Sequence, residues 1–127
     1  MSPDVTHSIE ISVTTEYLPE QSSPDAERYA FAYHITITNA GDLPARLNSR
    51  HWVITNGRGE IEEVRGDGVI GQQPVIGPGS HYRYTSGVVL STPVGSMRGS
   101  YQMIASDGER FAALIPIFTL SVPGSLN

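Results

Sequence analysis

The stretch YAFAYHITIT, residues 29–38, decides the fold of this chain. Large apolar side chains occupy every second position, and alanine, histidine or threonine stands between them. Successive side chains of an extended strand point to opposite faces, so a period of two gives a β-strand one apolar face. Shorter segments of the same kind begin at Ile9, Leu47, Glu60, His81, Tyr101 and Phe111. The sequence therefore predicts a mostly β fold, with residues 29–38 as its clearest strand.

Turn sequences separate the predicted strands. Asn39–Asp42 and Asn56–Gly59 are rich in turn formers, and the Asp-Gly pair within Ser106–Glu109 is typical of a type I′ hairpin. The apolar side chains of the last segment change parity near Pro116, which predicts a β-bulge at Pro116–Ile117. The predicted fold class is all-β, an immunoglobulin or fibronectin type III-like antiparallel β-sandwich of about seven to eight strands. A jelly roll or an open barrel is the alternative.

The composition agrees with a β fold. The chain of 127 residues has 10 Val, 11 Ile and 9 Thr but only 7 Leu and 8 Ala, the reverse of what a helical bundle needs. Its length predicts a single domain spanning residues 1–127, with disordered or loosely held ends at about residues 1–6 and 123–127.

Charge and cysteine content exclude several functions. The net charge is −5, and all 8 basic residues are arginine, which argues against a nucleic-acid partner. Because no apolar run approaches the length of a membrane span, we expect no membrane insertion. The N-terminus shows no secretory signal pattern, so we expect a cytoplasmic protein. The absence of cysteine excludes disulfides and thiolate chemistry.

Two aromatic residues refine the predicted sandwich. Trp52 lies where an immunoglobulin-like strand C carries its core indole. Tyr101 lies two residues before Met103, where antibody domains carry their second cysteine, and is therefore a candidate for a tyrosine corner.

A glycine-rich segment from Gly66 to Gly79 is predicted to be a long irregular connection. Gly66, Gly68 and Gly71 spell G-x-G-x-x-G, but the residues that follow cannot form the helix of a dinucleotide-binding fold. The simpler prediction is a turn or bulge that needs positive φ at those glycines. The alternative is a small-anion or nucleotide (pyrophosphate) site, with Arg50 or Arg65 as the counter-charge. The carboxylate of Asp67 within the loop weakens that alternative.

Metal ligands and catalytic groups are sparse. His34 and His81 would share an outer face if the first, second and Tyr82-containing strands formed one sheet, and an acidic cluster could attract magnesium weakly, namely Glu60, Glu62, Glu63 and Asp67. Direct divalent-cation binding is therefore a second alternative, although we assign no metal ligands and no cofactor. Ser96 lies one place away from a nucleophile elbow, and no paired carboxylates stand out. We expect no enzyme activity.

Arg50, His51 and Trp52 follow one another in one predicted strand and must alternate between its faces. An inward Arg50 would need a carboxylate partner, whereas an Arg50 at the rim would make a recognition surface beside the glycine-rich segment. The predicted partner-binding residues are Arg50, Trp52, Val69, Ile70 and Tyr84.

Several strings together resemble the ApaG family: Phe31-Ala32-Tyr33, Ser49-Arg50-His51-Trp52, Gly66–Pro74, Tyr84-Thr85-Ser86-Gly87, Met97–Tyr101 and Ile115-Pro116-Ile117-Phe118. The resemblance extends from about Ile9 to Asn127. It implies a fibronectin-like sandwich, a genetic link to cobalt resistance and magnesium efflux, and related domains in eukaryotic F-box and DNA-polymerase-interacting proteins. It implies no known biochemical activity.

The sequence thus predicts a non-enzymatic protein-interaction domain of unknown partner, connected through the resemblance with magnesium and cobalt efflux. The glycine-rich segment and neighbouring edge strands are the predicted docking surface. The Pro116-interrupted last strand is a predicted open edge, so the protein is expected to be a monomer or a homodimer.

Overall fold

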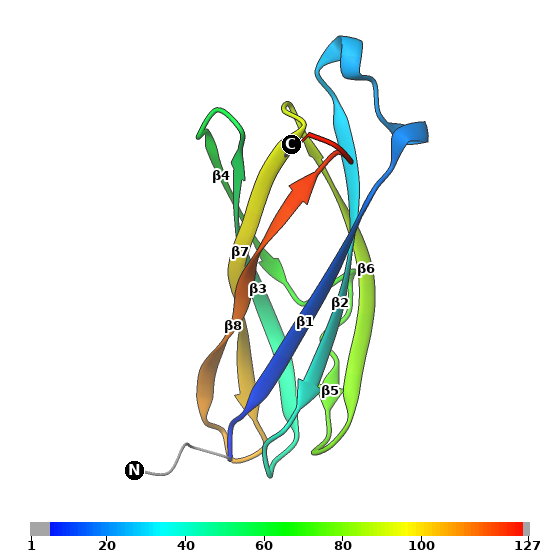
Figure 1. The fold of residues 1–127 in the computed structure, drawn as a ribbon. Helices are drawn as coiled ribbons and strands as arrows, with labels where there is room; N and C mark the ends of the chain where they lie inside the picture. The colour runs from blue at the N-terminus through cyan, green and yellow to red at the C-terminus, as the bar shows by residue number, and fades with distance from the viewer. Residues whose placement is uncertain (1–5, 126–127) are drawn as a thin grey trace.

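The computed structural model describes residues 6–125, which form two antiparallel β-sheets (Figure 1). The three-stranded sheet has the order β1 (Ile9–Tyr17), β2 (Tyr29–Asn39) and β6 (His81–Leu90). The five-stranded sheet contains β4 (Ile61–Asp67), β3 (Ala45–Asn56), β7 (Val94–Ala105) and β8 (Arg110–Ser121) in that order, and β5 (Val75–Ile76) pairs with the start of β3. Two single 3₁₀ turns, η1 (Pro19–Gln21) and η2 (Pro24–Ala26), join β1 to β2. The predicted all-β sandwich is confirmed.

The described residues bear on two smaller expectations. The predicted loose ends lie in large part outside the described chain, because residues 1–5 and 126–127 are not described. Within residues 6–125, no helix has the length and apolar character needed to cross a membrane.

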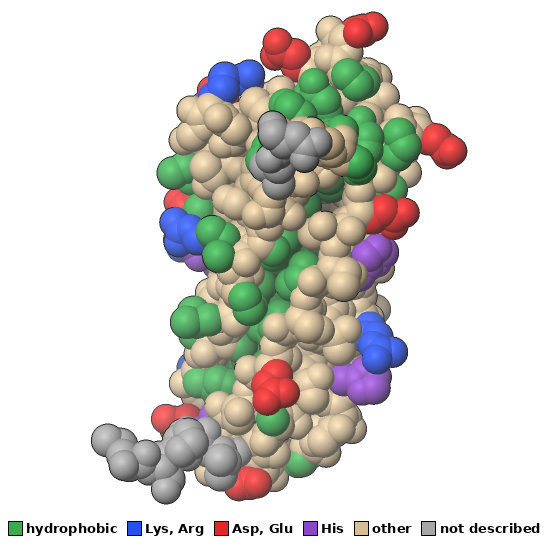
Figure 2. All heavy atoms as spheres, viewed as in Figure 1, with side chains coloured by type: hydrophobic (Ala, Val, Ile, Leu, Met, Phe, Trp, Pro, Cys, Tyr) green, Lys and Arg blue, Asp and Glu red, His purple; other side chains and the backbone are tan. Residues whose placement is uncertain are grey.

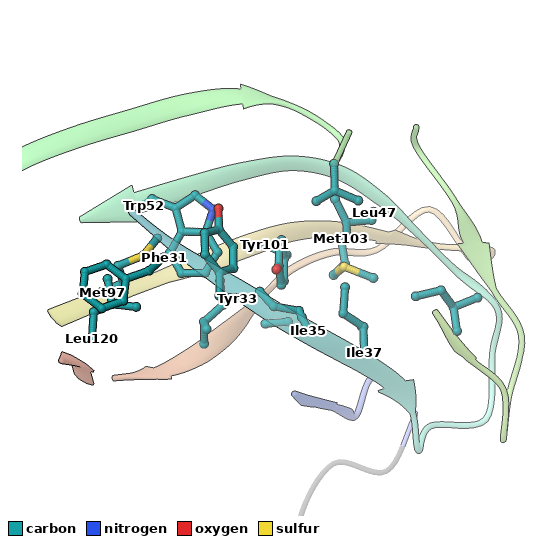
Figure 3. Close-up of a cluster of buried hydrophobic side chains, with 14 of the residues drawn as sticks. Phe31, Tyr33, Ile35, Ile37, Leu47, Trp52, Met97, Tyr101, Met103 and Leu120 are labelled. Carbon is teal, nitrogen blue, oxygen red and sulfur yellow. The ribbon is translucent and has the colours of Figure 1, made fainter. Parts of the chain in front are cut away.

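The core lies between the two sheets. From β2, the alternate side chains Phe31, Tyr33, Ile35 and Ile37 point toward the other sheet, as the period of two predicts. Figure 3 shows them facing the side chains that β3, β7 and β8 supply, which include Leu47, Trp52, Met97, Tyr101, Met103 and Leu120. Trp52 is 3% exposed, so the prediction of a core indole is confirmed.

Two β-bulges bend the five-stranded sheet. On β8, Pro116 and Ile117 together face the single residue Arg98 of β7, so the predicted bulge is confirmed. A second bulge, which the sequence did not predict, lies on β3, where Asn48 is the extra residue between Leu47 and Ser49. On the C-terminal side of this bulge β3 pairs with β4, and on its N-terminal side β3 pairs with β5. Residues 68–74, which connect β4 to β5, lie outside the sheet.

The two sides of the sandwich differ. On one side β1 packs beside β8 (Figure 1), and in the same view Figure 2 shows a narrow strip of hydrophobic side chains down the middle of that face. On the other side the sheets end in β4 and β6, which within the described residues each pair with only one strand and do not pack against each other as β1 and β8 do. The predicted open edge at β8 is therefore partly covered by β1, and the free edges that face each other are those of β4 and β6.

Candidate functional site

A groove of about 720 Å³, here called the inter-sheet groove, lies between the edges of β4 and β6. Apolar side chains from both sheets line its middle, and polar residues stand at its ends. Arg50 and Ser86 are among its lining residues near the glycine-rich segment, and Asn56, Glu60 and Ser91 line the opposite end. The apolar lining consists of Tyr33, Trp52, Ile54, Ile61, Val64, Val88, Val89, Leu90 and Met97.

The pairing of β3 with β4 explains which side chains face the groove. Arg50 lies opposite Gly66, Trp52 opposite Val64, and Ile54 opposite Glu62. Directly opposed residues of an antiparallel pair share one face of the sheet, and so do residues two apart along a strand. Because Trp52 points into the core, Arg50, Ile54, Glu62, Val64 and Gly66 are all on the groove side.

Arg50 holds the glycine-rich segment through its backbone. Its Nη1 donates to the carbonyl oxygens of Asp67 at 3.0 Å and Gly68 at 2.9 Å. The guanidinium lies against Gly66, where an added Cβ would come within 2.9 Å of it. Among residues 6–125 no carboxylate lies within ion-pair distance of Arg50, so the predicted structural ion pair is wrong. The other predicted role, a contact surface beside the glycine-rich segment, stays a prediction.

The loop at Gly68–Gln72 is a tight turn. Gly68 has φ +57° and Gly71 has φ +72°, so the prediction of positive φ is confirmed for these two glycines. It is wrong for Gly66, which instead makes room for Arg50. Val69 and Gln72 exchange backbone hydrogen bonds of 2.8 and 2.9 Å, and Ile70 and Gly71 between them both have positive φ, as in a type I′ turn. For the β-branched Ile70, at φ +47°, this conformation is strained.

The hydrogen bonds of this turn occupy three of the amides that the predicted anion cradle would need, those of Gly68, Val69 and Gln72. The amide of Gly68 donates to the carbonyl oxygen of Asn48 at 2.9 Å, and the amides of Val69 and Gln72 bond each other's carbonyls. The carbonyls of Asp67 and Gly68, rather than a set of N–H groups, face the Arg50 guanidinium. No contact in the described chain favours a pyrophosphate at Gly66, Gly68 and Gly71, and binding there stays an untested prediction.

Three tyrosines surround the Arg50 end of the groove. The hydroxyls of Tyr84 and Tyr101 share a short hydrogen bond, and Tyr33 lies beside Ser86. Tyr101 is fully buried and bonds a side chain of the opposite sheet rather than nearby backbone, so the tyrosine-corner prediction is wrong. Burial raises the pKa of Tyr84 and of Tyr101 far above the ordinary value of a phenol. Burial also raises the pKa of Tyr33, although Ser86 and Arg50 oppose it.

These buried phenols predict a loss of stability in alkaline solution. Tyr84 and Tyr101 stay neutral in the folded protein, whereas their unfolded forms ionise near pH 10, at about the pKa of a free tyrosine. The stability they support is therefore complete below about pH 10 and is lost as the pH rises further. We expect the free energy of unfolding to fall by about 1.4 kcal/mol per pH unit for each of the two groups above that pH.

Urea unfolding from about pH 8 to about pH 11, with phenolate absorbance recorded in parallel, measures this slope. The Tyr84→Phe variant removes one of the two groups, so its stability should fall less steeply with pH. A wild-type stability that stays constant across this range would contradict the prediction.

The histidines do not gather into a metal site. β1, β2 and β6 do share one sheet, as the metal hypothesis required. His34 bonds Thr85 at 2.8 Å and Glu16 at 3.4 Å, but His81 pairs with Thr38, four positions further along β2 and about 13 Å away. No group of three or more metal-binding side chains occurs among the described residues. Direct cation binding therefore remains a prediction without support from this geometry.

The predicted partner-binding residues fall into two groups. Arg50, Ile70 and Tyr84 line a small pocket of about 140 Å³ that adjoins the inter-sheet groove, and Ile70 is 60% exposed. Trp52 and Val69 also line it, but they are 3% and 1% exposed, which makes them core residues rather than parts of an exposed patch.

Sequence reasoning missed two features of this site. The sequence predicts Glu62 only as part of an acidic cluster, although its parity with Val64 places it on the groove side of β4. Asn48 gave no signal, because a carbonyl that anchors a loop depends on the backbone rather than on the side chain.

Comparison with known proteins gives closely similar chains. The sequence profile of the ApaG domain matches residues 19–105. A protein from Pseudomonas aeruginosa named Protein ApaG is 59% identical over 124 residues, which make up 98% of each chain. A protein of the same name from Aromatoleum aromaticum is 57% identical over 127 residues, with both chains covered completely.

Solved structures share the fold as well. The crystal structure of the putative ApaA protein from Bordetella pertussis matches with a TM-score of 0.93 and 46% identity, over 97% of this chain and 100% of that one. The X-ray structure of a structural genomics target matches with a TM-score of 0.88 and 50% identity, over 92% of this chain and 89% of the other. None of these names states a reaction, a ligand or a partner.

Proposed function

This chain belongs to the ApaG domain family, and on that premise we propose that it is a non-enzymatic interaction domain that binds an extended segment of a partner protein along the free edge of β4. The bound segment extends the five-stranded sheet by one strand and covers the inter-sheet groove. The role needs no catalytic group and no cofactor. The resemblance implies a genetic link to cobalt resistance and magnesium efflux, and the proposed partner is therefore one connected with divalent-cation export.

The free backbone of β4 carries this proposal. Asn56 donates its backbone N–H to the carbonyl oxygen of Glu60 at 3.0 Å, where the β3–β4 ladder begins. Hydrogen-bonded pairs alternate along an antiparallel ladder, so the N–H and C=O groups of Ile61, Glu63 and Arg65 point away from β3. They form a row of groups at the mouth of the groove that no residue from 6 to 125 pairs with, which is the arrangement that strand addition requires.

Exposed apolar side chains around the groove support the same role. Ile61 on β4 is 64% exposed and Val89 on β6 is 45% exposed, and both lie on the edges that line the groove, with side chains that alternate with those facing it. Ile70 stands in the adjoining pocket at the Arg50 end, exposed and in a strained backbone conformation. Exposed apolar groups and local strain both concentrate where proteins bind partners.

A proline at the free edge tests the proposal. Arg65→Pro removes an N–H that points away from β3, so the fold should persist while strand addition at that position is blocked. The probe is an uncharged, acetylated and amidated peptide, Thr-Gln-Thr-Val-Thr-Gln-Thr, followed by amide chemical shifts. We expect shifts on β4 and on the facing edge of β6, and at least about tenfold weaker binding to Arg65→Pro.

Arg65→Ala is the matched control, because it removes the same exposed side chain and keeps the N–H. It should bind the peptide within about twofold of the wild type, because the Arg65 side chain has no hydrogen bond or ion pair among the described residues. Equal binding by the proline and alanine variants, or peptide shifts confined to strands other than β4 and β6, would refute docking at this edge.

A further inference from the structure

Two opposite charges on the groove side of the five-stranded sheet lack an ion-pair partner within the described chain. Arg50 uses only Nη1, for the carbonyls of Asp67 and Gly68, so Nε and Nη2 keep donors for a ligand. The carboxylate of Glu62 has no hydrogen bond or ion pair to any residue from 6 to 125. Glu60, two residues earlier, already has partners. Arg58 Nε lies 3.1 Å from its Oε1, and Asn56 Nδ2 donates to the same oxygen at 2.7 Å.

The register of β4 spaces these charges. The groove side of β4 presents Glu62, Val64 and Gly66 at alternate positions. Gly66 has no side chain, and the Arg50 guanidinium lies over it instead. The edge of β4 therefore displays a negative charge, an apolar group and a positive charge in sequence, over four residues or about 13 Å.

A strand added to β4 would place its own alternate side chains opposite these three groups. Cross-strand neighbours in one face lie about 5 Å apart, close enough for an ion pair at each end and an apolar contact between them. The position opposite Gly66 meets a guanidinium, which binds carboxylates through paired N–H groups. The position opposite Glu62 meets a carboxylate, which favours an ammonium or guanidinium group.

Resting on the proposed docking at β4, we propose that the groove selects partner segments with an acidic, an apolar and a basic side chain at alternate positions. The acidic residue pairs with Arg50, the apolar residue packs on Val64, and the basic residue pairs with Glu62. A partner segment can run antiparallel or parallel to β4. An antiparallel segment carries the acidic residue first and the basic residue last, and a parallel segment carries them in the reverse order. Arg50 and Glu62 thus disfavour pairing of this exposed edge with unrelated strands and favour pairing with a segment of complementary charge.

Three acetylated and amidated peptides test the selection: Thr-Glu-Thr-Val-Thr-Lys-Thr, Thr-Glu-Thr-Val-Thr-Glu-Thr and Thr-Lys-Thr-Val-Thr-Lys-Thr. The wild type should bind the mixed peptide about three- to fivefold more tightly than the doubly acidic one, since Glu62 is exposed. It should bind the doubly basic peptide at least about tenfold more weakly than the mixed one, because Arg50 is half-buried. The measurement is an amide chemical-shift titration at low ionic strength.

The Glu62→Lys variant gives the decisive result, because the Glu62 side chain has no hydrogen bond or ion pair in the described chain whose loss could disturb the fold. This variant should reverse the first preference and bind the doubly acidic peptide about three- to fivefold more tightly than the mixed one. Glu63→Lys is the matched control. The Glu63 side chain is next to Glu62 in the sequence but points to the outer face, where it bonds His51, so this variant should keep the wild-type order of affinities.

The outcomes separate this inference from the docking proposal. If all three peptides shift the β4 amides with equal affinity, or if Glu62→Lys keeps the wild-type order, charge selection is wrong and docking stands. If none of the peptides, charged or uncharged, perturbs β4, the docking proposal falls and the selection falls with it.

Discussion

Replacing Trp52 by alanine is expected to lower the free energy of unfolding by about 3–5 kcal/mol, the usual cost of truncating a large aromatic side chain in a packed core. The indole is 3% exposed and lies edge-on to three rings. Its ring centroid is 5.4 Å from that of Tyr33 on the three-stranded sheet. Within its own five-stranded sheet it is 6.3 Å from the centroid of Tyr101 and 5.9 Å from that of Phe118. Removal of this side chain leaves a cavity between the sheets that neighbouring rigid strands cannot close.

Urea unfolding followed by far-ultraviolet circular dichroism measures this loss, because Trp52 is the only tryptophan and its fluorescence disappears with it. Leu114→Ala is the control, since that leucine is 77% exposed on β8 and its truncation should change stability by less than about 0.5 kcal/mol. A loss below about 1 kcal/mol for Trp52→Ala would show that the indole is not the centre of the core.

The second large effect is expected at Gly68, where alanine should cost about 2–4 kcal/mol through a backbone clash and an unfavourable φ. A Cβ at this position would stand 2.0 Å from the carbonyl oxygen of Gln72, a backbone atom within the same turn. The residue also has φ +57°, a conformation that favours glycine. The turn must therefore open, which withdraws Val69 from the core and the carbonyl of Gly68 from Arg50.

Gly71→Ala separates the two causes of this loss. Gly71 has φ +72°, but an added Cβ would meet nothing within 4 Å, so only the conformational cost of about 1 kcal/mol should remain. Denaturant unfolding of both variants, together with the amide shifts of the loop, tests the comparison. Equal losses at the two glycines would mean that the contact with Gln72 does not constrain the turn.

The position of Gly68 in this turn limits what a Gly68 substitution can reveal about anion binding. The G-x-G-x-x-G pattern correctly predicts positive φ at Gly68 and Gly71, because only local backbone geometry is involved. It does not predict the role of Gly66, which depends on the arginine that stands opposite it on β3. A substitution at Gly68 therefore disturbs the Arg50 end of the groove whether or not an anion binds there.

Alternation of apolar side chains within a single strand predicts correctly which of its side chains enter the core. The alternation in residues 29–38 predicted which side chains of β2 enter the core, and the change of parity at Pro116 predicted the bulge on β8. Both follow from the period-two geometry of a single strand. The bulge at Asn48 is marked only by a change of parity between the core residues Leu47 and Trp52, without the proline that signals the bulge on β8.

The sequence by itself determined the fold class, the family resemblance, the central place of Trp52 in the core and the positive φ at two glycines. Only the tertiary structure showed that β4 and β6 are the free edges that face each other, that Arg50 bonds backbone carbonyls rather than a carboxylate, and that Tyr101 bonds Tyr84. The physical reason is the range of the interactions. The face to which a side chain points is set within a few residues of its own strand, whereas a groove between two edges exists only after strands far apart in the chain have paired.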